Sequence, residues 1–334
     1  MRITRSIIET PPTDWSLWRK TIDRKKYIDF NKERFPVNAY FCNSVLTYIP
    51  NFENIQILGR IGSSSADGEV YRIGFQGLEF ALKIMPRIDN DSELKNRNEI
   101  ETAISASEYK DYFPITYSFG YCSDSSYYIS DEKTSAFIPK AIEYNLIFNL
   151  KNQITDLKLK KRFDADYRNG MIIQDLKNKY KLKLEDNKNI QVDFLISELA
   201  NGDLRTWMLR IHPIEEWKKI LIDIITGTYY LPSVLRKVHP DLHPGNVLII
   251  KGKEVKALIH DFGRCYDVTN ESYKSTLLSF CFEFISCVNL RDDLIVPREI
   301  LIIIQNIYEI VKKFDINADN IKQVYEQIIF PIII

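Results

Sequence analysis

The sequence predicts an α+β fold that is rich in strands toward the N-terminus and helical toward the C-terminus. Three short runs have the composition of strands: Ile55–Leu58, Glu69–Phe75 and Leu78–Ile84. Gln76-Gly77, between the second and third runs, is a natural hairpin turn. From Glu215 to Tyr230, bulky apolar residues recur at helical spacing, and the apolar segments after residue 263 predict two or three more helices.

Two further elements complete the predicted order. The segment from Ser92 to Tyr109 is polar and compatible with a helix, and one face of it gathers Ile100, Ala103, Ile104 and Ser107. Val192–Ser197 then has the composition of a strand. We therefore expect a helix after the hairpin and one more strand before the helical part of the chain.

Composition and charge narrow the class of protein. Of the 334 residues, 45% are hydrophobic and 27% charged, so the chain can bury a large core and is not expected to be disordered. Lysine plus arginine equals aspartate plus glutamate at 45 each, which predicts no binding to nucleic acid or to an anionic membrane. The five cysteines form no CxxC pair, and no signal peptide or membrane-length apolar run is present. These features favour a cytoplasmic protein with free thiols.

The chain is predicted to hold one large domain, from residue 51 to residue 334, after an N-terminal extension. Residues 1–50 are rich in aromatic and basic residues and are expected to pack on that domain. The segment 123–190 is rich in Lys, Asn and Asp and predicts a solvated insertion with one or two helices. Its basic stretch LKLKKR, residues 157–162, leaves open a docking surface for a partner.

The residues that could carry chemistry lie in two short motifs. Asp241 and Asn246 are five residues apart on a loop that contains proline and glycine. Asp261 follows a strand-like run, and Gly263 lets the backbone turn directly afterwards. Phosphoryl transfer from ATP needs hard oxygen ligands for Mg²⁺ and a carboxylate that positions the attacking hydroxyl. These residues supply both.

The two motifs, His239-Pro-Asp-Leu-His-Pro-Gly-Asn246 and Asp261-Phe-Gly263, resemble the catalytic loop and the metal-binding turn of the protein kinase superfamily. The resemblance covers about residues 55–290. It implies a bilobal fold, with a small β-rich N-lobe over about 51–200 and a helical C-lobe over about 201–334.

Matching positions give each motif residue an implied role in that family. Asp241 would be the catalytic base, and Asn246 and Asp261 would bind Mg²⁺ or Mn²⁺. His239 would be the structural histidine that holds the loop. The cofactors implied by the resemblance are therefore ATP and a divalent cation.

The N-terminal half carries a matching lysine. Phe80-Ala81-Leu-Lys83-Ile84 is similar to the Val-Ala-Ile-Lys strand of the family, which implies that Lys83 contacts the α- and β-phosphates and that Ala81 borders the nucleotide. The partner of Lys83 should be a glutamate on the next helix. Glu99 fits best, and Glu101 is the alternative.

The predicted phosphate loop departs from the GxGxxGxV pattern of the family. Its outer glycines are Gly62 and Gly68, a serine run (Ser63, Ser64 and Ser65) replaces the middle glycine, and Val70 follows. Backbone N–H groups and serine hydroxyls can still bind phosphate. A loop of this length most resembles the serine/threonine kinases of large DNA viruses, which would place the protein in the host cytoplasm or the virion.

Ile196-Ser-Glu198-Leu-Ala200 resembles the hinge of the family, whose backbone groups receive adenine. Ser197 would then occupy the gatekeeper position, and Glu198 and Ala200 would contact the nucleotide. For Asp203, two interpretations stay open. Its carboxylate could reach the ribose, or it could cap the helix that follows.

The chain departs from ordinary protein kinases in two places. The loop lysine that usually follows the catalytic aspartate by two residues is His243 here, which would assist the transferring phosphoryl group only when protonated. Asp-Leu-His-Pro-Gly-Asn is also similar to aminoglycoside and choline phosphotransferases. No Ala-Pro-Glu follows Gly263, so the substrate-docking region of the C-lobe is expected to be reduced.

The sequence most strongly predicts a serine/threonine protein kinase, with a protein hydroxyl as the acceptor. A small-molecule phosphotransferase is the alternative, supported by the His-containing loop. A pseudokinase that binds nucleotide without turnover is the third hypothesis. All three use the same nucleotide site, so they differ in acceptor and turnover.

Overall fold

The computed structural model describes residues 15–34, 38–42, 56–65, 68–75, 77–87, 90–122, 157–168, 171 and 192–333. The protein is a mixed α+β structure, as predicted, and its chain divides into two compact units. The first unit comprises Met1–Pro11, Asn38–Asn96 and Ser118–Ile196. The second comprises Pro12–Val37, Arg97–Tyr117 and Ser197–Ile334. Both units are discontinuous in sequence, whereas we expected a single division near residue 200.

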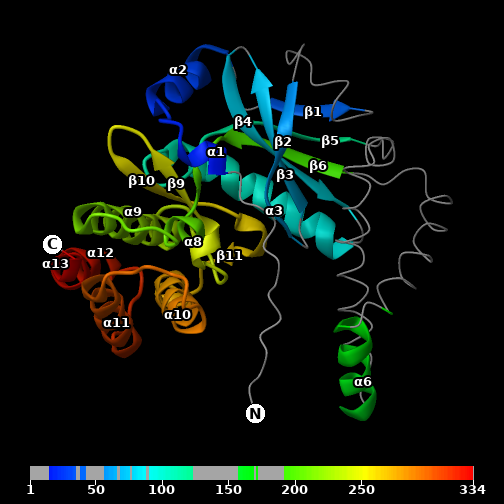
Figure 1. Ribbon diagram of the computed structural model, residues 1–334. Helices are drawn as coiled ribbons and strands as arrows, with labels where there is room; N and C mark the ends of the chain where they lie inside the picture. The colour runs from blue at the N-terminus through cyan, green and yellow to red at the C-terminus, as the bar shows by residue number, and fades with distance from the viewer. Residues whose placement is uncertain are drawn as a thin grey trace. The chain divides into compact units, whose positions relative to one another are not determined.

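The first unit is built on a six-stranded sheet in the order β1-β5-β6-β4-β3-β2 (Figure 1). The strands are β1 Asn38–Cys42, β2 Gln56–Ser65, β3 Gly68–Phe75, β4 Leu78–Pro86, β5 Thr116–Cys122 and β6 Val192–Glu198. Neighbours β2, β3 and β4 are antiparallel, and β1 is parallel to β5. The predicted strands match β3, β4 and β6, while β2 runs further than predicted.

The hairpin of β3 and β4 follows from the alternation of their sequences. One face of both strands is apolar and buried: Tyr71, Ile73, Phe75, Phe80, Leu82 and Ile84. Phe75 pairs with Leu78, so the turn has two residues, and Gly77 adopts the φ of +78° that such a tight turn requires. The hairpin predicted at Gln76-Gly77 is therefore confirmed.

The helix predicted over 92–109 is α3, Asn90–Ala106, followed by the short 3₁₀ turn η1, Ser107–Tyr109. Ile100 and Ala103 are buried, as the helical spacing predicted. The boundary between the two units falls within this helix, after Asn96.

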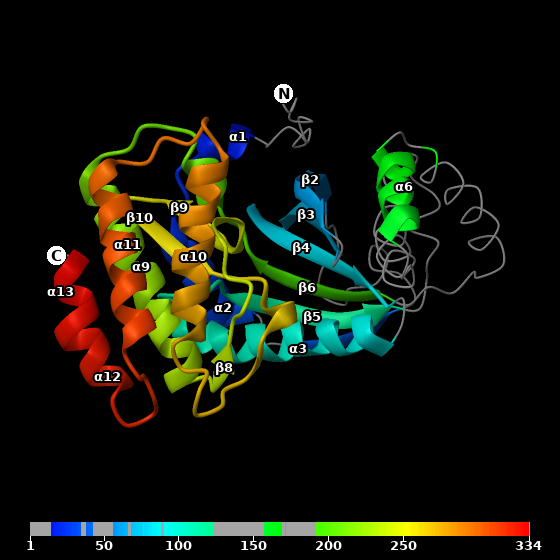
Figure 2. The same cartoon turned by 90° about the horizontal axis from the view of Figure 1, so that it is seen from below.

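Helices form most of the second unit. They are α8 Leu204–Trp207, α9 Ile214–Ser233, α10 Ser275–Leu290, α11 Arg298–Lys313, α12 Ile321–Val324 and α13 Phe330–Ile333, with a π-helical turn over Tyr325–Ile329. Figure 2 shows α10 and α11 side by side next to α9. The face of α9 predicted to be apolar is buried in this core: Trp217, Ile220, Leu221, Ile224 and Ile225.

Two small sheets position the loops of the second unit. The first has the order β10-β9-β7, with β7 Gly202–Asp203, β9 Val247–Lys251 and β10 Val255–Ile259. The second pairs β8, Lys237–Val238, with β11, Tyr266–Asp267. Two 3₁₀ turns complete the unit, η2 at Pro244–Asn246 and η3 at Phe262–Arg264. The motif residues predicted to carry chemistry lie in and around these two turns.

Part of the N-terminal extension also belongs to the second unit, where it forms α1 (Trp15–Trp18) and α2 (Arg24–Arg34). The basic stretch 157–162 lies in α6, Leu157–Arg168, where Leu159 is exposed. The rest of the predicted insertion, apart from Met171, lies outside the described residues. Its use as a docking surface stays a prediction.

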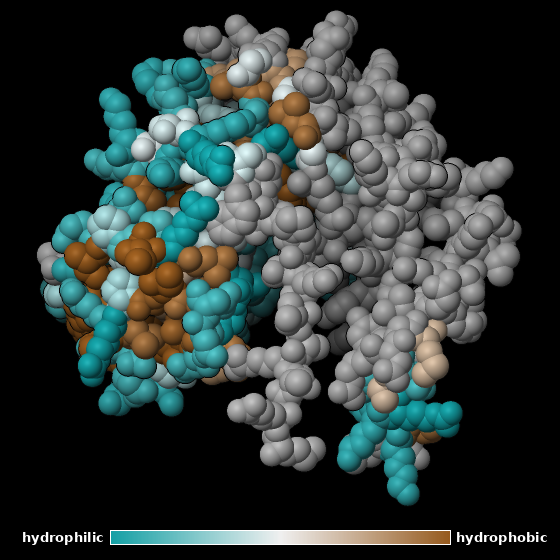
Figure 3. Space-filling view, viewed as in Figure 1, coloured by the Kyte–Doolittle hydropathy of each residue, from teal (hydrophilic) through white to brown (hydrophobic). Residues whose placement is uncertain are grey.

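The surface of the second unit carries apolar side chains over the region of α10 and α11 (Figure 3). The exposed members include Phe282 and Leu290 on α10 and Ile302 on α11. Among the described residues, no helix combines the length and the apolar character needed to cross a membrane.

Candidate active site

The loop between β8 and β9 holds Asp241 and Asn246 in a closed arrangement. The Asn246 side-chain Nδ2 donates to the backbone oxygen of Asp241 at 2.9 Å, and its backbone N–H donates to the oxygen of His243 at 2.8 Å. Asn246 is buried, whereas Asp241 is half-buried. Because Nδ2 is used inside the loop, Oδ1 is the side-chain atom that Asn246 can offer to a cation.

Helix α10 anchors the backbone of this loop through two hydroxyl groups. Thr276 Oγ1 accepts from the backbone N–H of His239 at 2.9 Å. Ser279 Oγ accepts from the Leu242 N–H at 3.2 Å and donates to the Pro240 oxygen at 2.7 Å. These two hydroxyls satisfy backbone groups of the loop that take no part in a regular helix or sheet. They thereby fix the loop on helix α10.

Asp261 precedes the turn η3 and lies close to the loop through its neighbour His260. His239 Nε2 donates to the His260 oxygen at 3.1 Å, and the His260 N–H donates to the Asn246 oxygen at 3.1 Å. Asp261 itself has φ +66° and ψ +66°, a left-handed conformation that few non-glycine residues adopt. Phe262 is buried beside the His239 ring, with 6.0 Å between ring centroids. The structure thus brings Asp241, Asn246 and Asp261 into one cluster.

Both histidines of the loop are built into its framework. Burial lowers the pKa of His239, whose Nε2 must carry the proton because its partner is a carbonyl oxygen. His243 Nδ1 accepts from the Gly245 N–H at 3.0 Å, with Arg205 Nη2 at 3.4 Å. Burial first, and then Arg205, lower the pKa of His243. Both causes favour the neutral form of its ring.

The second half of α3 contacts the turn that follows Asp261. Asn98 Nδ2 donates to the backbone oxygens of Phe262 at 3.4 Å and Cys265 at 2.5 Å. Glu99 is buried, and a Cβ atom placed on Gly263 would lie 3.2 Å from Glu99 Oε2. The glycine therefore leaves room for the glutamate carboxylate beside the turn.

The two glutamates proposed as partners of Lys83 have different surroundings. Glu99 is 4% exposed at the turn, whereas the Glu101 carboxylate is solvent-exposed and paired with Arg97 at 2.8 Å. This difference favours Glu99. Its pairing with Lys83 stays a prediction, because the two residues belong to different units.

The first unit carries the residues predicted to bind the phosphates. Lys83 lies in β4 directly opposite Val70 in β3, and Ala81 lies opposite Arg72. Residues that pair directly, or that are two apart in a strand, share a face of a sheet. Lys83, Ala81 and Val70 therefore share the face opposite to the buried one.

The predicted phosphate loop forms the end of the β2–β3 hairpin. Gly62, Ser63, Ser64 and Ser65 belong to β2, and Ser65 pairs with Gly68 after a register shift. They are therefore part of a strand rather than of the open loop we expected. Their side chains, and residues 66 and 67, lie outside the described residues. Binding of phosphate at this hairpin stays a prediction.

Gly68 has a structural reason to be glycine. Its φ is +154°, and a Cβ atom there would lie 2.5 Å from the Ile84 carbonyl oxygen in the neighbouring strand. No side chain fits at that separation without movement of the backbone. The glycine is thus required by the approach of β4, whatever the hairpin binds.

Replacing Gly68 with alanine is expected to destabilise the hairpin by about 2 kcal/mol, because positive φ and a backbone clash add. Amide hydrogen exchange of β3 and β4 without nucleotide measures the loss. Gly77→Ala is the matched control, since Gly77 also has positive φ (+78°) but no atom within 4 Å of its Cβ position. Unchanged exchange in Gly68→Ala, together with lost ATP binding, would instead assign the glycine to the ligand.

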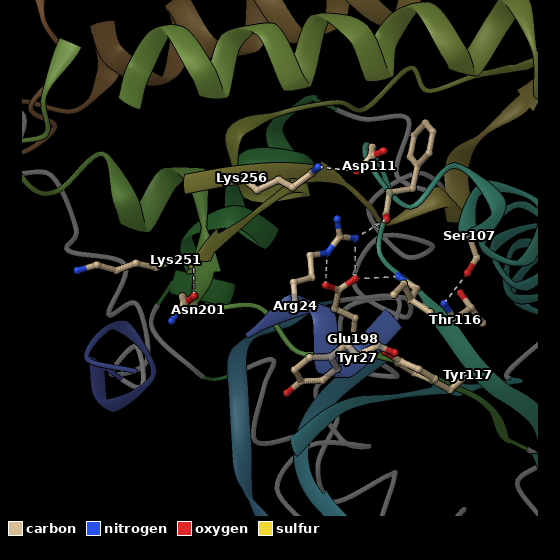
Figure 4. A network of polar contacts seen from close by, with 12 residues as sticks. Arg24, Tyr27, Ser107, Asp111, Thr116, Tyr117, Glu198, Asn201, Lys251 and Lys256 are labelled. Atoms are coloured by element: carbon tan, nitrogen blue, oxygen red, sulfur yellow. Dashed lines mark hydrogen bonds and ion pairs between the residues drawn. The ribbon is translucent and has the colours of Figure 1, made fainter. Parts of the chain in front are cut away.

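Glu198, in the segment predicted to receive adenine, has its side chain committed to the protein interior (Figure 4). Arg24 Nε and Nη2 bind its two carboxylate oxygens at 2.5 and 2.9 Å. The Ile115 N–H also donates to Oε2 at 3.0 Å, and Arg24 Nη2 donates to the Phe113 oxygen at 3.3 Å. A nucleotide could therefore use only the backbone of Glu198.

The N-terminal helices are joined to the same region by three more contacts. Asn201 Nδ2 donates to the Leu17 and Lys20 oxygens at 2.7 and 2.9 Å, while its Oδ1 accepts from the Lys251 N–H at 2.6 Å. The Trp18 ring lies over Gly202, where a Cβ atom would come within 2.3 Å of it. Within the second unit, residues 15–34 therefore contact residues 198–202, whereas the packing of the whole extension 1–50 on a domain stays a prediction.

Asp203 acts as the N-cap of α8. Its Oδ1 accepts from both the backbone N–H and the hydroxyl of Thr206, each at 2.6 Å. Of the two interpretations left open by the sequence, the cap is the one the structure shows. A contact of Asp203 with ribose stays a prediction. Ala200, which follows β6 in the sequence, is buried.

Two arginines of this region were missed by sequence reasoning. Arg264 Nη1 lies 3.3 Å from Asp241 Oδ2. Its position directly after Gly263, three residues from Asp261, was a signal that could have found it. Arg24 stands in a basic run with no feature that sets it apart, so only the fold reveals its partner.

No protein-family model matches the chain, and no curated protein matches it. Among the described residues, no group of three or more His, Cys, Asp or Glu side chains is placed to hold a metal ion. A Mg²⁺–nucleotide site needs fewer protein ligands, because phosphate oxygens and water complete the coordination. The function is therefore inferred from Asp241, Asn246 and Asp261 and from the contacts around them.

Proposed function

We propose that this protein is an ATP- and Mg²⁺-dependent phosphotransferase with a protein-kinase-like, bilobal fold, and that its acceptor is a serine or threonine hydroxyl of a protein. One observation carries the proposal: the cluster of Asp241, Asn246 and Asp261 tied together through His239 and His260. Two carboxylates and an amide on a fixed loop and a tight turn are the protein groups that phosphoryl transfer requires.

The cluster suits a divalent cation bound to phosphates. Asn246 Oδ1 and the Asp261 carboxylate would hold the ion, and both are the hard oxygen donors that Mg²⁺ prefers. Mg²⁺, when bound, neutralises charge on the phosphate oxygens. The left-handed backbone of Asp261 supports this assignment, because strained conformations concentrate at functional sites.

The remaining roles follow from where each side chain lies. Asp241 is half-buried at the open side of the loop, so its carboxylate can position an acceptor hydroxyl and receive its proton. Lys83, with Glu99 as its partner, would bind the α- and β-phosphates, and the backbone of residues 198–200 would receive adenine. The strand-rich first unit and the helical second unit agree with an N-lobe and a C-lobe.

One observation favours a small-molecule phosphotransferase as the second candidate. His243 is built into the loop as a cap for η2, so the loop is adapted to histidine rather than to the lysine of ordinary protein kinases. The aminoglycoside and choline phosphotransferases share this Asp-Leu-His-Pro-Gly-Asn pattern. We rank it second, because the same cap could equally serve a divergent protein kinase.

An acceptor screen with γ-labelled ATP and Mg²⁺ tests the proposal. We expect label on casein, on histone or on the protein itself, and none on kanamycin or choline. Label on the small molecules alone would establish the second candidate. ATP binding without transfer to any acceptor or to water would identify a pseudokinase and contradict the proposal.

A further inference from the structure

Arg264 presents a cation directly at the carboxylate proposed as the catalytic base. Its Nη1 is 3.3 Å from Asp241 Oδ2, and the two side chains are 53% and 36% exposed. An ion pair this open to solvent is weak and exchanges readily with other charges. The guanidinium can therefore leave Asp241 when another anion arrives.

His243 and Arg205, two other basic side chains at this loop, are engaged in contacts of the loop itself. His243 turns its Nδ1 toward the Gly245 N–H, inside the loop, and Arg205 lies against that same ring at 3.4 Å. The loop position from which ordinary protein kinases offer a lysine thus holds a ring that caps a turn. Arg264, in contrast, pairs with the Asp241 carboxylate while about half of its side chain stays exposed to solvent.

We propose that Arg264 is a catalytic residue, which binds the transferring phosphoryl group beside Asp241. The proposal rests on the phosphotransferase function proposed above. In the step, the acceptor oxygen forms a bond to the γ-phosphorus while the bond from that phosphorus to the β,γ-bridging oxygen breaks. The electron pair leaves with ADP, the acceptor proton passes to Asp241, and Arg264 stays protonated.

The position of Arg264 explains how its side chain can pair with Asp241 when no nucleotide is bound and with phosphate when nucleotide is bound. Arg264 is the last residue of η3, directly after Gly263, so its backbone belongs to the turn while about half of its side chain is exposed to solvent. Without nucleotide it neutralises Asp241. With nucleotide, the phosphoryl oxygens are the stronger anion, and a planar guanidinium binds two of them at once.

The test compares kcat for ATP hydrolysis and for transfer to casein in variants of Arg264. Arg264→Met is expected to lower kcat about 100-fold, as for the loss of one donor to a transition-state oxyanion, with ATP affinity unchanged. Arg264→Lys should keep part of the activity, because it keeps a point charge. Fluorescent-nucleotide titration and tryptophan fluorescence show that binding and folding are intact.

Rescue separates catalysis from a structural role. Adding His243→Lys to Arg264→Met restores a cation at the loop and is expected to regain about tenfold in kcat. His243→Gln in the same background is the matched control, which removes the ring without adding charge and should regain nothing. Wild-type or higher activity in Arg264→Met, or equal activity of the two double variants, would overturn the proposal. A wild-type protein that turns over no ATP would instead refute the phosphotransferase function on which it rests.

Discussion

Replacing Asp241 with asparagine is expected to lower phosphotransfer about a thousandfold, because a positioned general base contributes factors of this size. The variant should bind ATP as tightly as the wild type. The loop contact made by Asp241 uses its backbone oxygen, which accepts from Asn246 Nδ2 and is untouched by the change. Labelled transfer to casein measures the rate, and equilibrium titration with a fluorescent nucleotide measures the affinity.

The control for Asp241→Asn is the same substitution at Asp267. Asp267 lies nearby on β11, is 86% exposed in its side chain and pairs with Lys237 at 2.7 Å. Since exposed ion pairs contribute little, Asp267→Asn should keep wild-type transfer. Equal activity of Asp241→Asn and wild type would remove Asp241 from the mechanism and with it the proposed function.

The order of strands and helices could be predicted because it depends on patterns among residues that are close in the sequence. Alternation in β3 and β4, the glycine in their turn and the apolar stripe of α9 each depend on residues that are neighbours in sequence. The same holds for the loop from His239 to Asn246. Its internal hydrogen bonds span a few residues, so the motif and its geometry go together.

Features that depend on distant segments could not be predicted. The requirement for glycine at position 68 comes from the Ile84 carbonyl oxygen in another strand. The sequence motif alone suggested only a role in phosphate binding. The units are discontinuous because residues 12–37 and 97–117 group with the C-terminal part of the chain. Arg24 and Glu198 are 174 residues apart, and neither has a neighbour in sequence that signals the pair.

Replacing Arg24 with methionine is expected to lower the free energy of unfolding of the second unit by about 3 kcal/mol, because it leaves a buried carboxylate without its counter-charge. The Glu198 side chain is 0% exposed and that of Arg24 12%, so water cannot replace the lost partner. All four tryptophans (Trp15, Trp18, Trp207 and Trp217) belong to the second unit. Urea unfolding followed by tryptophan fluorescence therefore measures this unit.

Lys25→Met is the matched control on the same helix. Lys25 pairs with Asp29 at the surface, where its side chain is 79% exposed, so its loss should leave the unfolding free energy nearly unchanged. A similar small change in Arg24→Met would show that the Arg24–Glu198 pair does not hold the N-terminal helices in place. The expected contrast comes from the burial of the Arg24–Glu198 pair and from the additional hydrogen bonds that Arg24 makes.

The double variant Arg24→Met with Glu198→Met decides what the pair contributes. Removing both charges replaces an ion pair by apolar side chains, which is often close to neutral in stability, so the double variant should recover most of the loss. Under the proposed function, the double variant should still bind ATP more weakly than the wild type. The side chain at position 198 would no longer be held by Arg24 and the Ile115 N–H, so the backbone proposed to receive adenine would be less ordered. We therefore expect a higher KM for ATP with kcat little changed, in a protein whose stability is near that of the wild type.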